Sequence, residues 1–178
     1  MRKLLLATSA VAMMAGAAQA GGHADVKIGV MLGFTGPAES LAPDMAAGAE
    51  AAIAEVNESG AFLDGLTLEP IRADSTCIDA SLATAAAERL ITSDGVSGIV
   101  GALCSGATGA ALANVALPNG MVMISPSATS PGLSTAEDKG LFFRTAPSDA
   151  RQGVVMTEIL LEEGITEVAV TYTNNDYG

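Results

Sequence analysis

Short apolar runs alternate with segments of helical periodicity along most of this chain, and this alternation constrains the fold more than any other feature. The runs of strand type are Val26–Leu32, Leu66–Ala73, Val96–Val100, Met121–Ile124 and Glu167–Thr173. The first helical segment is Asp44–Glu58, which follows Pro43 and precedes Gly60, and the second begins at Asp79 or Ser81 and ends at Gly95. The third is Gly106–Leu117, which precedes Pro118, and the fourth begins after its cap Ser148 and ends at Gly164. Strands joined by helices of this length predict an α/β fold, with a parallel sheet that has helices on both faces.

A glycine-rich turn follows the third predicted strand. Gly101–Gly109 reads Gly-Ala-Leu-Cys-Ser-Gly-Ala-Thr-Gly and opens the third predicted helix. Amides at a helix start lack partners within the helix, and the helix dipole favours negative charge there, so such a turn can hold an anion. The spacing is close to that of a phosphate-binding loop, but Ala107 stands where that motif has lysine. A smaller anion such as a carboxylate therefore fits better. The glycines can also serve tight packing alone.

The first twenty residues have the pattern of a secretory signal peptide. Arg2 and Lys3 precede the apolar run Leu4–Ala18, and Ala18-Gln19-Ala20 is a cleavage site of the A-x-A type. The run is too short and too rich in alanine for a membrane-spanning helix. We expect cleavage after Ala20 and export to the periplasm, with no membrane-embedded segment in the mature chain.

Charge and cysteine content narrow the classes of partner. The chain carries a net charge of −12 at pH 7, and the signal peptide contains two basic residues and no acidic ones. An acidic surface disfavours binding to nucleic acid and to anionic membranes, and it also promotes solubility. Two cysteines in an exported chain favour one disulfide, although two free thiols also fit the sequence.

Three polar loops are predicted at one edge of the sheet. They are Gly33–Pro37 after the first strand, the turn that holds Ser105, and Ser125–Leu133 after the fourth strand. Ligands of open parallel sheets bind at this carboxyl end, near the point where the strand order reverses. The three loops contain no lysine, arginine or histidine, so hydroxyls and backbone amides would hold a carboxylate there. Ser127 and Thr129 can also serve only to cap turns.

A series of motifs resembles the periplasmic branched-chain amino-acid binding proteins of ABC transporters. They are Val30–Pro37, Ala54–Gly60, Asp74–Cys77, Gly101–Ser105, Ile124–Thr129, Phe143–Thr145 followed by Asp149 and Gln152, and Asn175–Gly178. The resemblance implies the type I fold of that family, in which two α/β lobes close over a small ligand. It also implies a receptor that delivers its ligand to the membrane permease of an importer. We expect a monomer without a cofactor.

The resemblance places the ligand carboxylate and the disulfide. In the family, the serine after the second disulfide cysteine binds the α-carboxylate of the ligand. This role falls on Ser105, and the disulfide falls on Cys77 and Cys104. The loop after the fourth strand supplies a backbone group and a threonine hydroxyl to the ligand, so we expect Ser127, Ala128 and Thr129 to bind it.

Two further positions come from the same resemblance. A tyrosine before a glycine in the second lobe closes over the ligand, and Tyr177 has this place. Leu41 stands where leucine and valine receptors have an aromatic residue, which weakens the case for those ligands. Relatives in the wider family bind amides, urea or small aromatic acids.

The family pattern divides the chain into three parts. Residues 1–20 are the signal peptide, 21–146 belong to lobe one, and 147–178 begin lobe two. The return to lobe one and most of lobe two, with the acidic partner of the ligand ammonium, are missing from the sequence. We therefore interpret the sequence as an N-terminal fragment.

Two other functions fit parts of the sequence. A ligand-sensing domain of the same fold would have the same pocket and would feed a regulator or receptor. A secreted hydrolase that uses Ser105 would need a positioned base, but the sole histidine is His23 and the Gly-x-Ser-x-Gly pattern is absent. We therefore predict no enzymatic activity, and one histidine with two cysteines predicts no metal site. The ligand class stays broad: a small amino acid or a related carboxylate or amide.

Overall fold

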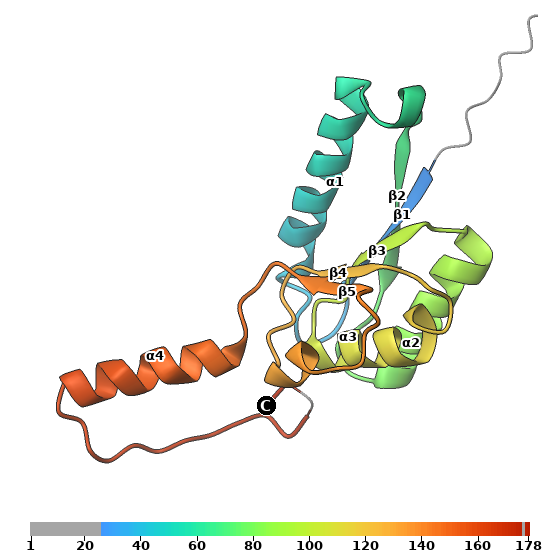
Figure 1. Cartoon of the computed structure of the whole chain (residues 1–178). Coiled ribbons are helices and arrows are strands. Elements are labelled where there is room, and N and C mark those ends of the chain that lie inside the picture. Colours follow the sequence, from blue (N-terminus) through green and yellow to red (C-terminus); the bar gives the residue numbers. More distant parts are fainter. Residues whose placement is uncertain (1–25, 176) are drawn as a thin grey trace, which may run out of the picture.

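A five-stranded parallel sheet organises the described part of the protein (Figure 1). The computed structural model describes residues 26–175 and 177–178, so the predicted signal peptide and cleavage site lie outside the described residues. The strands are β1 (Val26–Leu32), β2 (Leu68–Asp74), β3 (Gly98–Gly101), β4 (Met123–Ser125) and β5 (Phe142–Arg144). Their order is β2-β1-β3-β4-β5, and every neighbouring pair is parallel. The order reverses between β1 and β3, which makes their carboxyl ends the topological switch point.

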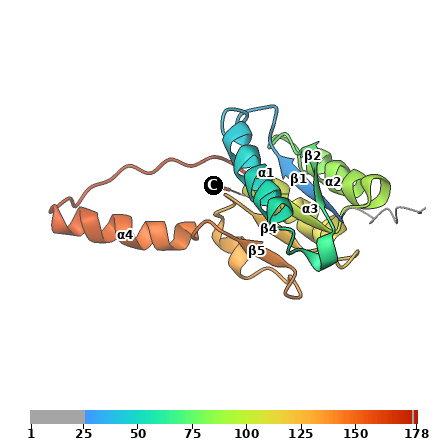
Figure 2. The same ribbon diagram turned by 90° about the horizontal axis from the view of Figure 1, so that it is seen from above.

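Helices cover both faces of this sheet, as the sequence predicted. The α-helices are α1 (Ala42–Ser59), α2 (Ala80–Arg89), α3 (Ser105–Ala111) and α4 (Asp149–Glu162). Short helical turns are η1 (Leu63–Gly65), η2 (Leu90–Asp94), η3 (Leu112–Ala116) and η4 (Pro131–Ser134). Figures 1 and 2 show α1 on one side of the sheet, α2 and α3 on the other, and α4 extending away from it. None of the helices in the described ranges is long and apolar enough to cross a membrane.

Two apolar clusters hold the helices on the sheet. The larger one joins α2, α3 and η3 to the inner strands and includes Leu90, Leu112 and Met123, all at most 2% exposed. The smaller one joins α1 to β1 through Val30, Leu32 and Ala46, which are fully buried. Burying a side chain of the size of leucine contributes about 1.5–3 kcal/mol, so these two clusters dominate the stability of the sheet.

Local sequence signals fix most of the helix ends. The Asp79 carboxylate accepts the Ser81 amide proton at 2.7 Å and caps α2, and the Ser148 hydroxyl caps α4. Gly60 ends α1 in a left-handed conformation with φ 62°. These predicted boundaries are confirmed within one or two residues.

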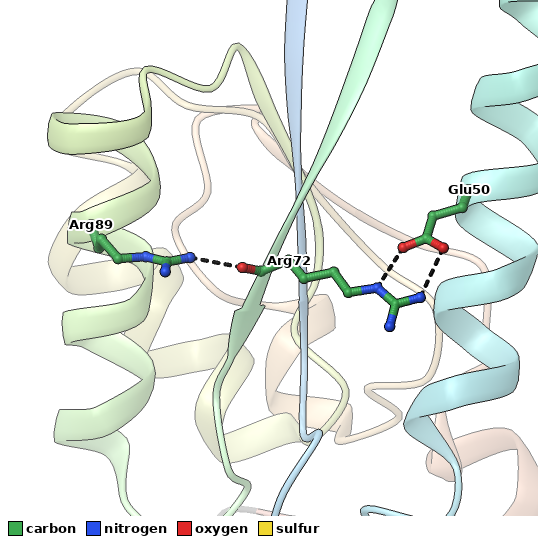
Figure 3. Close-up of polar contacts among 3 residues, drawn as sticks. All are labelled: Glu50, Arg72 and Arg89. Carbon is green, nitrogen blue, oxygen red and sulfur yellow. Dashed lines mark hydrogen bonds and ion pairs between the residues drawn. The ribbon is translucent and has the colours of Figure 1, made fainter.

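A polar bridge ties both helical layers to the edge strand β2 (Figure 3). The Arg72 guanidinium donates to both Glu50 carboxylate oxygens, from Nε at 2.6 Å and from Nη2 at 2.8 Å. This hydrogen-bonded guanidinium holds the pKa of the Glu50 carboxyl below its ordinary value. From the other side, Arg89 Nη2 donates to the Arg72 carbonyl at 2.7 Å. The bridge thus connects α1 to α2 across β2.

Three of the predicted elements need correction. Glu167–Thr173 is not a strand, because the segment runs apart from the sheet and no neighbouring strand supplies ladder partners (Figures 1 and 2). Phe142–Arg144 forms β5 instead, a three-residue strand that is too short to produce a recognisable alternation. The second and third predicted helices are also divided, since α2 passes into the π-helical turn η2 at Leu90 and α3 into η3 at Leu112.

Candidate functional site

A pocket of about 690 Å³ lies at the carboxyl ends of β1, β3 and β4. Each of the three predicted loops contributes lining residues: Pro37, Ser105, and Ser127 with Thr129. Among the residues that line the pocket, all of them in the described part of the chain, none is lysine, arginine or histidine. The charged lining residues are the acids Asp79 and Asp149. A negatively charged ligand group would therefore be held by uncharged donors.

Ser105 is the first residue of α3 and is 3% exposed. Its Oγ accepts the Ser130 amide proton at 3.1 Å, so its own proton is available to an acceptor in the pocket. The first intrahelical bond of α3 runs from the Thr108 amide to the Cys104 carbonyl at 2.9 Å. Gly106 and Ala107 also line the pocket. Their amides precede the first intrahelical hydrogen bond of α3, so no carbonyl of the helix accepts their protons.

The loop after β4 presents two of its three predicted ligand residues to the pocket. Ser127 lines it while its hydroxyl donates to the Leu103 carbonyl at 2.8 Å. Thr129 lines it while its hydroxyl donates to Asp149 Oδ2 at 2.7 Å. Ala128 is 1% exposed and lies beneath this surface, and its amide donates to Ser125 Oγ at 2.9 Å. The structure therefore gives Ala128 a role in packing the loop.

Arg144 organises the same loop, a role that was not predicted from the sequence. Its Nη1 donates to the carbonyls of Ala128 at 3.2 Å and Ser130 at 2.9 Å, on either side of Thr129. Its Nη2 donates to the Ser134 hydroxyl. The sequence gives only a weak signal that Arg144 holds this loop: the loop itself contains no cation, and Arg144 is an arginine that follows it.

The remaining predicted contact residues line the pocket rim. Leu41 and Tyr177 are both about half exposed, at 53% and 54%. Tyr177 reaches the pocket from the C-terminal segment, and its amide donates to the Asn175 side chain at 3.0 Å. The pocket is also lined by Asp79, Asp149 and Gln152, which were not predicted as ligand contacts.

The predicted disulfide is confirmed and forms part of the pocket wall. Cys77 and Cys104 are bonded with their Cα atoms 5.6 Å apart, and both residues line the pocket. The bond joins the segment after β2 to the turn before α3, so it fixes the position of Ser105 relative to the start of α2.

Asp74, the last residue of β2, anchors the loop after β1. Its carboxylate accepts the Thr35 hydroxyl proton at 2.6 Å and the Thr76 amide proton at 2.8 Å. Burial acts to raise the pKa of Asp74, but the hydrogen bonds from the Thr35 hydroxyl and from the amides of Thr76, Thr35 and Phe34 hold that pKa below its ordinary value. The carboxylate thereby keeps one wall of the pocket in place.

Stability should consequently fall as acid protonates Asp74. Folding lowers the pKa of the Asp74 carboxyl from its ordinary value of 3.8. Such a carboxyl stabilises the folded protein fully at pH values above the ordinary pKa. The stabilisation disappears as the pH falls through the lower pKa of the folded state. We expect Asp74→Asn to lower the free energy of unfolding by about 1 kcal/mol at pH 7. The difference from wild type should shrink below pH 3.8. Urea titrations across pH 2–7 would measure it, with Glu39→Gln on the same loop as the control for losing one charge. An equal difference at every pH would contradict the assignment.

Comparisons with known proteins agree on one family. A family model described as periplasmic binding protein matches residues 25–178. The Leu/Ile/Val-binding protein of Escherichia coli K12 is 32% identical over 155 residues, which are 86% of this chain and 41% of that protein. The chain therefore spans about two fifths of the length of that curated relative. That relative carries the name of a binding protein, as does the leucine-, isoleucine-, valine-, threonine-, and alanine-binding protein of Pseudomonas aeruginosa, which is 34% identical over 154 residues.

Solved structures agree with this family and with the fold. The branched-chain amino acid substrate-binding protein LivJ from Streptococcus pneumoniae, in complex with isoleucine, superposes with a TM-score of 0.70 at 32% identity and covers 78% of this chain and 38% of its own. A solute-binding protein of Rhodopseudomonas palustris BisB5, in complex with 3,4-dihydroxy benzoic acid, superposes with a TM-score of 0.69 at 22% identity, covering 80% and 37%. The second likeness shows the fold alone, and the sheet is that of type I periplasmic binding proteins.

Proposed function

The chain belongs to the periplasmic binding protein family, and we propose that it is an extracytoplasmic receptor for a small amino acid, which it delivers to the permease of an ABC importer. One observation carries this proposal: a pocket at the switch point of the sheet, where the Ser105 hydroxyl and the first amides of α3 have free hydrogen-bond donors. The names of the relatives, which bind branched-chain amino acids, support the same ligand class.

Uncharged donors are sufficient to hold the carboxylate of an amino acid. A carboxylate that accepts hydrogen bonds from a hydroxyl and two amides is held at its charged oxygens, and each such bond contributes about 1.5–3 kcal/mol. The helix dipole of α3 and η3 adds a favourable field at the same place. An arginine would hold the carboxylate by a bidentate, charge-assisted pair, and no arginine in the described part of the chain lines this pocket.

Ser105→Ala should weaken amino-acid binding by about 1.5–3 kcal/mol, or roughly 10- to 150-fold in Kd, because a hydrogen bond to a charged group is lost. The free energy of unfolding should fall by only about 1 kcal/mol, since the Ser130 amide loses its acceptor. Isothermal titration calorimetry of the complete gene product with the common L-amino acids would measure the first effect and urea denaturation the second. Ser59→Ala, which removes an exposed hydroxyl at the far end of α1, is the control. Wild-type affinity in the Ser105 variant would contradict the proposal.

We also propose that the chain is exported and that it is divided into a signal peptide and parts of two lobes. Residues 1–20 would be a signal peptide cleaved after Ala20, 21–146 lobe one, and 147–178 the beginning of lobe two. The family match that begins at residue 25 supports a leader outside the binding domain. Two facts support the lobe boundary: α4 contains no buried residue, and it extends away from the sheet (Figure 1). Mass spectrometry of periplasmic protein would test the cleavage site, and sedimentation would test the expected monomer.

A further inference from the structure

The Thr129 hydroxyl is committed to a carboxylate. Thr129 Oγ1 donates to Asp149 Oδ2 at 2.7 Å, and the Asp149 amide donates back to the Thr129 carbonyl at 3.0 Å. Both residues line the pocket and are partly exposed. This two-way contact connects the loop after β4 to the first turn of α4.

The contact determines what the Thr129 hydroxyl can offer to a ligand. A hydroxyl has one proton and two acceptor lone pairs, whereas an ionised carboxylate can only accept. Because the proton of Thr129 goes to Asp149, the hydroxyl faces the pocket with lone pairs alone. A ligand group beside it must donate a hydrogen bond, and the negative charge of Asp149 favours a donor that is positively charged.

Ser105 has the opposite polarity. Its hydroxyl accepts from the amide of Ser130, the residue directly after Thr129, and keeps its own proton for an acceptor. Two adjacent residues thus set the hydrogen-bonding roles of the two hydroxyls: Thr129 gives its own proton to Asp149, and the Ser130 amide donates to Ser105. One is left as a donor for a carboxylate and the other as an acceptor for an ammonium group.

The other acid in the pocket does not compete for this role. The Asp79 carboxylate accepts the Ser81 amide proton at 2.7 Å and caps α2. Hydrogen bonds from the Ser81 amide and hydroxyl hold the pKa of Asp79 below its ordinary value, so the carboxylate stays ionised as the cap of α2. Asp149 is the acid whose carboxylate contacts a predicted ligand hydroxyl.

We propose that Asp149 is a specificity-determining positioning residue: by fixing the Thr129 hydroxyl as an acceptor, it makes the pocket select ligands that carry an ammonium group over carboxylates that lack one. The inference rests on the proposed function, since it assumes that the ligand carboxylate binds at Ser105. It goes further in assigning the discrimination between an amino acid and its des-amino analogue to one residue that acts through another.

The test uses the complete gene product and one matched ligand pair. The L-amino acid that binds most tightly serves as the probe together with its des-amino analogue; for leucine the analogue is 4-methylpentanoate. Wild type should prefer the amino acid strongly, and Asp149→Ala should reduce that preference by at least about tenfold, mainly through weaker binding of the amino acid. Asp44→Ala, which removes an exposed acid from the first turn of α1, should keep the wild-type preference.

A double-mutant cycle separates action through Thr129 from a direct or a merely structural effect. If Asp149 acts through Thr129, then Thr129→Val should abolish most of the effect of Asp149→Ala on the preference, whereas independent contacts would give additive effects. Equal weakening of both ligands by Asp149→Ala, or full additivity in the cycle, would overturn the inference. Failure of every amino acid to bind wild type would instead overturn the proposed function, and this inference with it.

Discussion

Gly101→Ala should be among the most destabilising single substitutions in this protein, with a loss of about 3 kcal/mol or more in the free energy of unfolding. Gly101 ends β3 opposite Met31 of β1 and has φ 144°, a conformation that other residues rarely adopt. A Cβ atom there would lie 2.1 Å from the Met31 carbonyl oxygen. Because that oxygen belongs to the backbone of a central strand, neither group can move away.

A matched variant in the same strand separates this effect from a general cost of changing glycine. At Gly98 the nearest heavy atoms to an added Cβ are 3.9 and 4.0 Å away, which is ordinary contact. Gly98→Ala should therefore leave stability within about 1 kcal/mol of wild type. Thermal and urea unfolding of both variants would measure the difference. Similar stabilities for the two would mean that β1 and β3 can separate at Gly101.

Removal of the disulfide is the second large effect. The bond between Cys77 and Cys104 joins residues 27 positions apart, and the chain-entropy model gives roughly 3.5 kcal/mol for a loop of this length. We expect Cys77→Ala with Cys104→Ala to lower the free energy of unfolding by that amount. The variant should also bind ligand more weakly, because both cysteines line the pocket.

Reduction of the wild-type protein provides the internal control. Dithiothreitol should lower the stability of wild type by a similar amount and should leave the double variant unchanged. Two alkylatable thiols in protein taken from the periplasm would contradict the disulfide. An unaltered unfolding curve after reduction would show that the packing around residues 77 and 104 is sufficient without it.

Sequence reasoning was accurate where local chemistry decides the structure. Strand β1 was predicted with its observed ends, since Val26–Leu32 is rich in β-branched and apolar residues. The caps Asp79 and Ser148 and the stop at Gly60 depend on contacts within a few residues, which the sequence displays directly. Position along the chain was also enough to place Ser105, Ser127 and Thr129 at one end of a parallel sheet.

Sequence reasoning failed where a distant partner decides the structure. The apolar segment Glu167–Thr173 has the composition of a strand, but a strand exists only where a neighbour pairs with it. The three residues of β5 form a strand because β4 lies beside them, a fact that their own composition does not reveal. The burial of the Ala128 side chain beneath the pocket surface likewise depends on the fold of the loop after β4, and any contact of this residue with a ligand stays a prediction.

The sequence by itself thus determined the class of fold, the capped helix ends and the three loops of the pocket, because these follow from propensity, periodicity and chain order. Only the tertiary structure decided the strand order, the clash that requires glycine at residue 101, and the direction of the hydrogen bonds at Ser105 and Thr129. The last of these depends on Ser130 and Asp149, which lie 25 and 20 residues away from their partners. Local rules cannot specify such pairs, since the packing of the whole sheet brings them together.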